Sequence, residues 1–164
     1  QFFTDLISDS PTKQWKLPDW FSDYKHKLIL NIHSTEITTK YLLFHDCGKS
    51  YCRTVKDGKV HFPNHAEISG EVWESVGGNS DVGRLIRNDM VFHTSNAEEI
   101  YKKLLEWSVE DACTLLLAAF SEIHSNANMF NSLGIESESF KIKWKHLNRR
   151  GKQACKYLFE QKED

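Results

Sequence analysis

The sequence has no long apolar run, little proline and few cysteines. None of its apolar segments approaches the roughly 18 residues that cross a bilayer as a helix, and no secretory signal is visible, so no membrane partner is expected. The four cysteines have neither CxxC spacing nor the density of a disulfide scaffold: Cys47, Cys52, Cys113 and Cys155. We expect reduced thiols and a cytoplasmic location.

What is present is an ordinary globular composition. The chain has 164 residues, of which 40% are hydrophobic and 27% charged, with a formal net charge of −2. This length is enough for one hydrophobic core, and no repeat or low-complexity linker divides it. The sequence therefore predicts a single domain over residues 1–164. A net charge near zero does not by itself indicate a nucleic-acid partner.

Helical periodicity dominates most of the chain. We expect helices over residues 19–30, 35–46, 64–75, from 79 or 80 to about 90, 97–107, 109–130 and 144–161. Ser34 is the expected N-cap of the second of these helices. Residues 1–18 contain two prolines and scattered aromatics, which indicates an irregular N-terminal arm. The fold class expected is therefore all-α.

One segment has a different pattern. Between residues 53 and 62, Asp57-Gly58 is flanked by β-branched residues, which is a strong signal for a two-residue hairpin turn. We expect a small β-hairpin here, close in the chain to the motif described next.

The most informative stretch is Phe44-His45-Asp46-Cys47-Gly48-Lys49, which follows the apolar helix end Tyr41–Leu43. Adjacent helical residues diverge by about 100°, so His45 and Asp46 converge on one ion only if they lie where the helix ends. Gly48 permits the backbone to turn away, and Lys49 adds a cation beside the pair. The alternative is a solvated helix end with two polar residues.

This motif resembles the signature of the HD-domain superfamily of metal-dependent phosphohydrolases, apolar-apolar-His-Asp-x-Gly-Lys. The resemblance covers roughly residues 26–125 and implies an all-α, HD-type helical bundle, here with the hairpin inserted near residues 53–62. It implies a divalent-metal-dependent phosphohydrolase acting on a phosphoester of a nucleotide or of a nucleic-acid end. His45 and Asp46 would be metal ligands. A non-catalytic HD-like module that binds a nucleotide or a protein partner is the alternative.

The resemblance also implies roles for residues after the motif. His65, which opens the next expected helix, matches a family His that serves a second metal or the substrate phosphate. Asp89 stands where the family has a His, which favours Mg²⁺ or Mn²⁺ over Fe, Co, Ni or Zn. His93 lies four residues later, so we expect it on the same helical face as Asp89. Surface or helix-cap roles are the alternatives for His65 and Asp89.

Two further ligands implied by the resemblance have open assignments. The family's first His corresponds to His33 or, within the first expected helix, to His26. The family's final carboxylate corresponds to Glu122 or Asp111, which lie on one stripe of the helix expected over residues 109–130. We expect His33 and Glu122.

Phosphoester hydrolysis needs an activated water, neutralised phosphate oxygens and a proton donor. A bound divalent ion would supply the activated water. Lys49, Arg53 and Arg87 each lie near an expected ligand in the sequence, so they are candidates for binding the substrate phosphate. Lys49 is also expected to be catalytic, and His65 or His93 is a candidate general acid.

The C-terminal segment over residues 140–161 is strongly basic. Between Phe140 and Phe159 there is no Asp or Glu but there are seven cations: Lys141, Lys143, Lys145, Arg149, Arg150, Lys152 and Lys156. A basic helix with interleaved aromatics can follow a phosphate backbone, although it can also be the solvated face of an amphipathic helix. The expected partner is thus a nucleotide or nucleic-acid phosphate, and the oligomeric state stays open.

Overall fold

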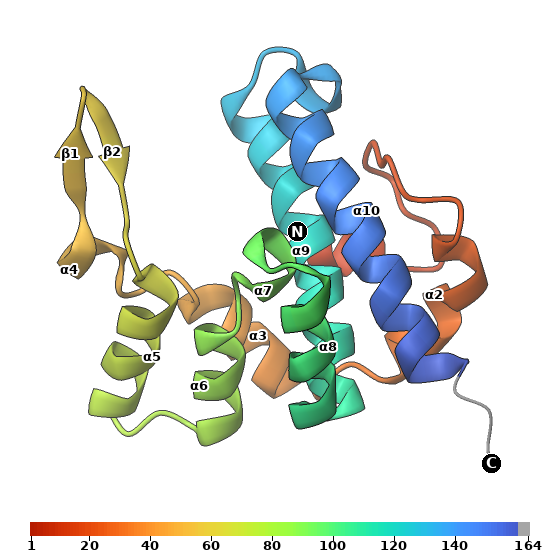
Figure 1. Cartoon of the computed structure of the whole chain (residues 1–164), viewed down its shortest axis with the longest axis horizontal. Helices are drawn as coiled ribbons and strands as arrows, with labels where there is room; N and C mark the ends of the chain where they lie inside the picture. Colours follow the sequence, from red (N-terminus) through yellow and green to blue (C-terminus); the bar gives the residue numbers. More distant parts are fainter. Residues whose placement is uncertain (161–164) are drawn as a thin grey trace. The chain divides into compact units, whose positions relative to one another are not determined.

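The protein is mostly helical, with one small antiparallel hairpin (Figure 1). The computed structural model describes residues 1–160. It confirms the predicted all-α class with a small β insertion. The described part divides into a terminal unit, residues 1–32 and 91–160, and a central unit, residues 33–90. The prediction of one domain over residues 1–164 stays a prediction.

The terminal unit is built around its longest apolar helix. Its elements are α1 (Phe2–Leu6), α2 (Phe21–Leu30), α7 (Val91–Thr94), α8 (Ala97–Glu106), α9 (Val109–Phe130), the 3-10 turn η1 (Gly134–Glu136) and α10 (Glu138–Phe159). Helix α9 packs against α1, α2, α7 and α10, and every residue from 111 to 121 is buried. A mostly apolar helix that is buried on all sides belongs in the middle of a core. The predicted span of this helix is confirmed.

Two predicted boundaries in this unit are wrong. The N-terminal arm is not irregular throughout, because residues Phe2–Leu6 form α1, and Phe3 and Leu6 are buried. The last helix begins at Glu138, six residues before the predicted start, because the Ser137 side chain accepts a hydrogen bond from the Phe140 N–H and caps it. The predicted end at Gln161 lies outside the described residues.

Polar side chains hold the arm to the long helices. The Asp5 carboxylate accepts hydrogen bonds from the Thr12 and Lys13 N–H groups and from the Trp15 indole, which hold the pKa of Asp5 well below its usual range. The Lys16 N–H donates to Nε2 of His124 on α9. The Lys16 carbonyl in turn accepts from the Trp144 indole on α10.

His124 should make stability depend on pH. Its Nδ1 donates to the Phe120 carbonyl and its Nε2 accepts from Lys16, and burial lowers the pKa of His124. The neutral form is thus favoured, so this stabilisation is complete above the ordinary pKa of about 6.5 and is lost as pH falls below it. We expect His124→Gln to reduce the loss of unfolding free energy between pH 7.5 and 5.5, measured by urea denaturation. The control is His146→Gln, which removes an exposed histidine and should leave the loss of unfolding free energy as it is in the wild type. If both variants lost the same unfolding free energy between pH 7.5 and 5.5, His124 would not be the source of the pH dependence.

The central unit contains the predicted motif. Its elements are α3 (Thr35–Phe44), α4 (Lys49–Cys52), β1 (Thr54–Lys56), β2 (Lys59–His61), α5 (His65–Ser75) and α6 (Ser80–Arg87). Ser34 caps α3 by accepting from the Ile37 N–H, as predicted, and Asn79 caps α6. Helix α6 packs against both α3 and α5, and its Val82, Leu85 and Ile86 are fully buried.

The hairpin forms where the sequence predicts it. Asp57 and Gly58 have φ values of 52° and 73°, which a two-residue hairpin turn of this kind requires. Val55 pairs with Val60, and all six strand residues are exposed. Within the central unit the hairpin extends away from α5 and α6 (Figure 1).

All four cysteines are free thiols. Among the helices of residues 1–160, none combines the length and apolar character needed to cross a bilayer.

Candidate functional site

His45 and Asp46 lie in the turn that follows α3. His45 is the C-cap residue, and its N–H still bonds to the Tyr41 carbonyl. The backbone turns away after α3 as expected, but Gly48 has an ordinary φ of −84°, so the turn does not depend on a left-handed glycine. Its lack of a side chain matters for packing: a Cβ there would lie 2.4 Å from the Ser69 nitrogen and 2.7 Å from the Ile68 carbonyl carbon. Glycine thus lets the turn lie directly against the backbone of α5.

Helix α5 brings the second histidine to this turn. The Ser69 hydroxyl accepts from the Gly48 N–H at 2.9 Å, and the Cys47 thiol donates to the Ser69 carbonyl. His65 lies four residues before Ser69, so both occupy one face of α5. Burial raises the pKa of Cys47, which therefore stays a thiol beside the site.

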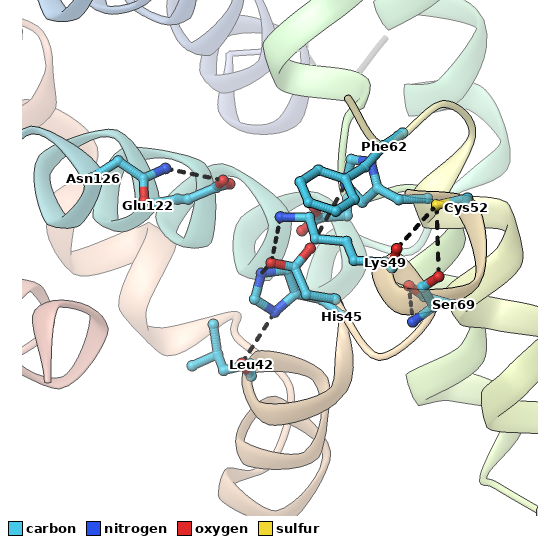
Figure 2. A network of polar contacts seen from close by, with 12 residues as sticks. Leu42, His45, Lys49, Cys52, Phe62, Ser69, Glu122 and Asn126 are labelled. Carbon is cyan, nitrogen blue, oxygen red and sulfur yellow. Dashed lines mark hydrogen bonds and ion pairs between the residues drawn. The ribbon is translucent and has the colours of Figure 1, made fainter. Parts of the chain in front are cut away.

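The Asp46 carboxylate is the centre of the cluster. Its Oδ2 lies 3.5 Å from His45 Nε2 and 2.6 Å from Lys49 Nζ, and its Oδ1 lies 3.7 Å from His65 Nε2. The Lys49 ammonium also lies 5.5 Å from the centre of the Phe62 ring (Figure 2). The cluster is partly open, with exposed side-chain fractions of 38% for Asp46 and 16% for His65.

Both imidazoles are held in one tautomer by the backbone. Nδ1 of His45 is 3.1 Å from the Leu42 carbonyl (Figure 2), and Nδ1 of His65 is 3.2 Å from the Phe62 carbonyl. A carbonyl only accepts, so each Nδ1 carries the proton. Nε2 is therefore the ring atom of each histidine left for a ligand, and both Nε2 atoms face Asp46. A backbone carbonyl on the far nitrogen is the usual support of a metal-binding histidine.

The cluster is not arranged as a metal centre as it stands. Within residues 1–160, no three His, Cys, Asp or Glu side chains form a group that could hold a metal ion. Asp46 turns a different oxygen toward each imidazole, and the Lys49 ammonium occupies the oxygen nearer His45.

Asp89 is close to the cluster but is held by another residue. It is 6% exposed and lies in the turn after α6, where its Oδ1 accepts from the Tyr41 hydroxyl. The Tyr41 ring is 5.9 Å from the His45 ring. The expectation that Asp89 and His93 share a helical face is wrong, because α6 ends at Arg87 and α7 begins at Val91.

The candidates for the first histidine are not brought to the cluster within the central unit. His33 precedes the cap of α3, whereas His45 follows its end, so the ten-residue helix, about 15 Å long, separates them. His26 is exposed on α2 and belongs to the terminal unit.

The remaining predicted acid–base residues lie in the terminal unit. His93 Nε2 is 3.0 Å from Glu122 Oε2, and Asn126 donates to the other Glu122 oxygen (Figure 2). Asp111, the alternative carboxylate, is buried in the first turn of α9. The structure thus pairs His93 with Glu122.

Of the two arginines predicted to bind phosphate, one is exposed and the other forms ion pairs within the protein. Arg53 is exposed at the entry to the hairpin. Arg87 forms ion pairs with Glu67 at 3.1 Å and Glu74 at 3.0 Å, both on α5. Arg87 therefore joins α6 to α5, and we leave it out of the site.

Sequence reasoning missed three residues that shape the cluster. Ser69 holds the motif turn, Tyr41 connects Asp89 to His45, and Phe62 supports both His65 and Lys49. The four-residue spacing of His65 and Ser69 was the one usable signal. Nothing local in the sequence indicates the other two contacts.

Comparison with known proteins found no matching protein-family model, curated protein or solved structure.

Proposed function

We propose that this protein is a divalent-metal-dependent phosphohydrolase of the HD type, acting on a phosphoester of a nucleotide or of a nucleic-acid end. The observation that carries the proposal is the pair of oriented imidazoles, His45 and His65, on either side of the Asp46 carboxylate. The order of a helix, a His-Asp turn and a later helix that opens with His65 supports the HD assignment.

The donor types suit a divalent ion, and each imidazole is near enough to Asp46 to share one with it, although the three side chains must rearrange to bind one ion together. Ligand nitrogen and oxygen atoms lie about 2.1 Å from such an ion, so two ligand atoms are at most about 4.2 Å apart. The two imidazole–carboxylate distances, 3.5 and 3.7 Å, fall within that limit. His45, Asp46 and His65 would hold the ion. Two imidazoles favour Mn²⁺ over Mg²⁺, which prefers oxygen ligands.

When bound, a divalent ion lowers the pKa of a water ligand and polarises a phosphoryl oxygen. The chain's own contribution is orientation and charge. The Leu42 and Phe62 carbonyls fix the orientation of both rings through Nδ1, so that each Nε2 is directed to the site. Lys49 binds a substrate phosphoryl oxygen beside Asp46, and Arg53 adds a second, exposed cation at the hairpin entry.

A second candidate is a non-catalytic module that binds a nucleotide phosphate. The observation in its favour is the Lys49–Asp46 ion pair of 2.6 Å, which neutralises the carboxylate without an ion. In this function Lys49 contacts the phosphate, and no water is activated.

Metal loading combined with two chromogenic esters tests the proposal. The purified chain is treated with a chelator and reloaded with Mn²⁺, and bound metal is measured by elemental analysis. Hydrolysis of p-nitrophenyl phosphate and of bis-p-nitrophenyl phosphate then reports monoesterase and diesterase activity. We expect His45→Gln and His65→Gln each to lower Mn²⁺ affinity at least about 100-fold and to abolish hydrolysis, because each removes one ligand.

His61→Gln is the matched control, since this histidine is exposed on β2 of the same unit. It should keep metal content and activity. Full metal occupancy in both test variants would show the HD proposal to be wrong. Metal binding with no hydrolysis of either ester would favour the second candidate.

A further inference from the structure

Helix α10 carries a regular row of cations. Positions 141, 145, 149, 152 and 156 fall within about 80° of one another around a helix, and the row is about 22 Å long at 1.5 Å per residue. We call these residues the basic stripe: Lys141, Lys145, Arg149, Lys152 and Lys156. Arg150 lies on the opposite face, where it is 7% exposed and donates to the Phe92 and His93 carbonyls. Arg150 is thus a core residue and not part of this surface.

The basic stripe is exposed and lacks local neutralisation. All five side chains are exposed. Lys141 pairs with Glu136 at 3.5 Å, whereas within residues 1–160 no ion pair is found for the other four. Some lysines elsewhere in the chain do have acidic partners, such as Lys40 with Glu36 and Lys102 with Glu98. The stripe is therefore a local positive potential on a chain whose net charge is −2.

A groove with aromatic walls runs beside the stripe. It has a volume of about 530 Å³ and is lined by two indoles, three cations and one carboxylate, with two further polar side chains: Trp20, Trp144, Lys145, Arg149, Lys152, Asp19, His146 and Asn148. The indole of Trp20 donates to the Asn148 side chain and that of Trp144 donates to the Lys16 carbonyl, so both rings are held in place. Trp20 is only 8% exposed and forms the floor of the groove, whereas Trp144 is half-buried and is the ring that a ligand can reach. Gly151 makes room for Trp20, because a Cβ there would lie 2.8 Å from its ring.

We infer that the basic stripe and this groove form a binding surface for single-stranded nucleic acid. The surface lies wholly in the terminal unit, so the inference does not rest on the proposed hydrolytic function. Its length exceeds what one nucleotide phosphate can contact, and only a linear polyanion engages cations from Lys145 to Lys156 together. The fixed, half-buried Trp144 ring beside this row of cations is suited to stack on a base of a strand whose backbone follows the stripe.

The packing of α10 argues against a membrane as the partner. Membrane-surface helices insert an apolar face into the lipid. The apolar face of α10 is occupied inside the protein, since Phe140, Leu147, Ala154 and Cys155 are buried and the helix packs on α8 and α9. An acidic polypeptide would satisfy the charges but would make no use of the aromatic groove.

The test measures binding of a fluorescent single-stranded oligonucleotide to the full chain by anisotropy, without divalent ions, across a salt series. We expect the triple variant Lys145→Gln/Arg149→Gln/Lys152→Gln to weaken binding at least about tenfold and to reduce the slope of log K against log salt by about 2. The matched control is Lys40→Gln/Lys102→Gln/Lys103→Gln, which changes net charge equally but removes lysines that already have acidic partners. It should change affinity less than twofold.

Three results would overturn the inference. The first is equal weakening in both triple variants, which would indicate a general effect of net charge. The second is equally tight binding of polyglutamate or of the matching duplex. The third is binding to phosphatidylserine vesicles that depends on the stripe, with no oligonucleotide binding. Melting curves of the variants confirm folding, and the p-nitrophenyl phosphate assay reports separately on the central unit.

Discussion

Gly48→Ala should be among the most destabilising substitutions in the central unit. Its new Cβ would meet three backbone atoms of α5, at 2.4, 2.7 and 2.8 Å, and a helix backbone cannot rotate away as a side chain can. We expect a loss of about 3 kcal/mol, the upper end of typical overpacking, which corresponds to a melting temperature lower by roughly 10 °C. The substitution should also abolish Mn²⁺ binding, because the motif turn and His65 would be forced apart.

Gly83→Ala is the control for this prediction. Gly83 lies inside α6 of the same unit, and a Cβ there meets its nearest neighbour, a Trp73 ring atom, at an ordinary 3.4 Å. Alanine is also the better helix former by about 0.5–1 kcal/mol, so this variant should match or exceed the wild-type melting temperature. If both variants melt within 2 °C of each other, the close contact between the turn and α5 is not what makes Gly48 necessary.

Lys49→Gln should strengthen metal binding and weaken hydrolysis at the same time. The ammonium lies 2.6 Å from Asp46 Oδ2 and competes with an ion for that oxygen. Without it, Mn²⁺ should bind at least about tenfold more tightly, since like charges no longer share the site. Hydrolysis of p-nitrophenyl phosphate should nevertheless fall about 100-fold, because the phosphoryl oxygen loses its charged partner. Titration calorimetry with Mn²⁺ and steady-state kinetics measure the two effects.

Tighter Mn²⁺ binding together with slower hydrolysis in Lys49→Gln would distinguish the phosphohydrolase from the non-catalytic module. Lys59→Gln removes an exposed lysine from β2 of the same unit and should change neither quantity more than twofold. In the non-catalytic module, Lys49→Gln would weaken nucleotide binding and produce no Mn²⁺ site. A Lys49→Gln variant that behaves like Lys59→Gln in both measurements would remove Lys49 from the site altogether.

The elements with local causes were predictable from the sequence. Asp57-Gly58 predicted the hairpin because these residue types tolerate the positive φ angles that the turn requires. Ser34 predicted the start of α3 because its hydroxyl satisfies an N–H three residues later. The apolar pattern of residues 109–130 predicted α9 from end to end. In the site, the same kind of reasoning placed His45 and Asp46 at a helix end.

Other features depend on contacts that no local pattern encodes. The break between α6 and α7 separates Asp89 from His93 without a proline or glycine to mark it. Arg150 belongs to a basic run in the sequence but is buried, because the carbonyls of Phe92 and His93 accept its hydrogen bonds. Gly48 is required by the approach of α5, not by its own backbone angles.

The sequence by itself thus determined the helical class, the hairpin and the residue types of the His-Asp motif, since these follow from preferences acting over a few neighbouring residues. Only the tertiary structure decided that His65 faces Asp46, that backbone carbonyls orient both imidazoles and that Lys49 neutralises the carboxylate. Ser69 on α5 lies more than twenty residues after His45, and its bond to Gly48 sets how the motif turn meets that helix. A contact of that kind forms only when the hydrophobic packing of α3, α5 and α6 brings the segments together.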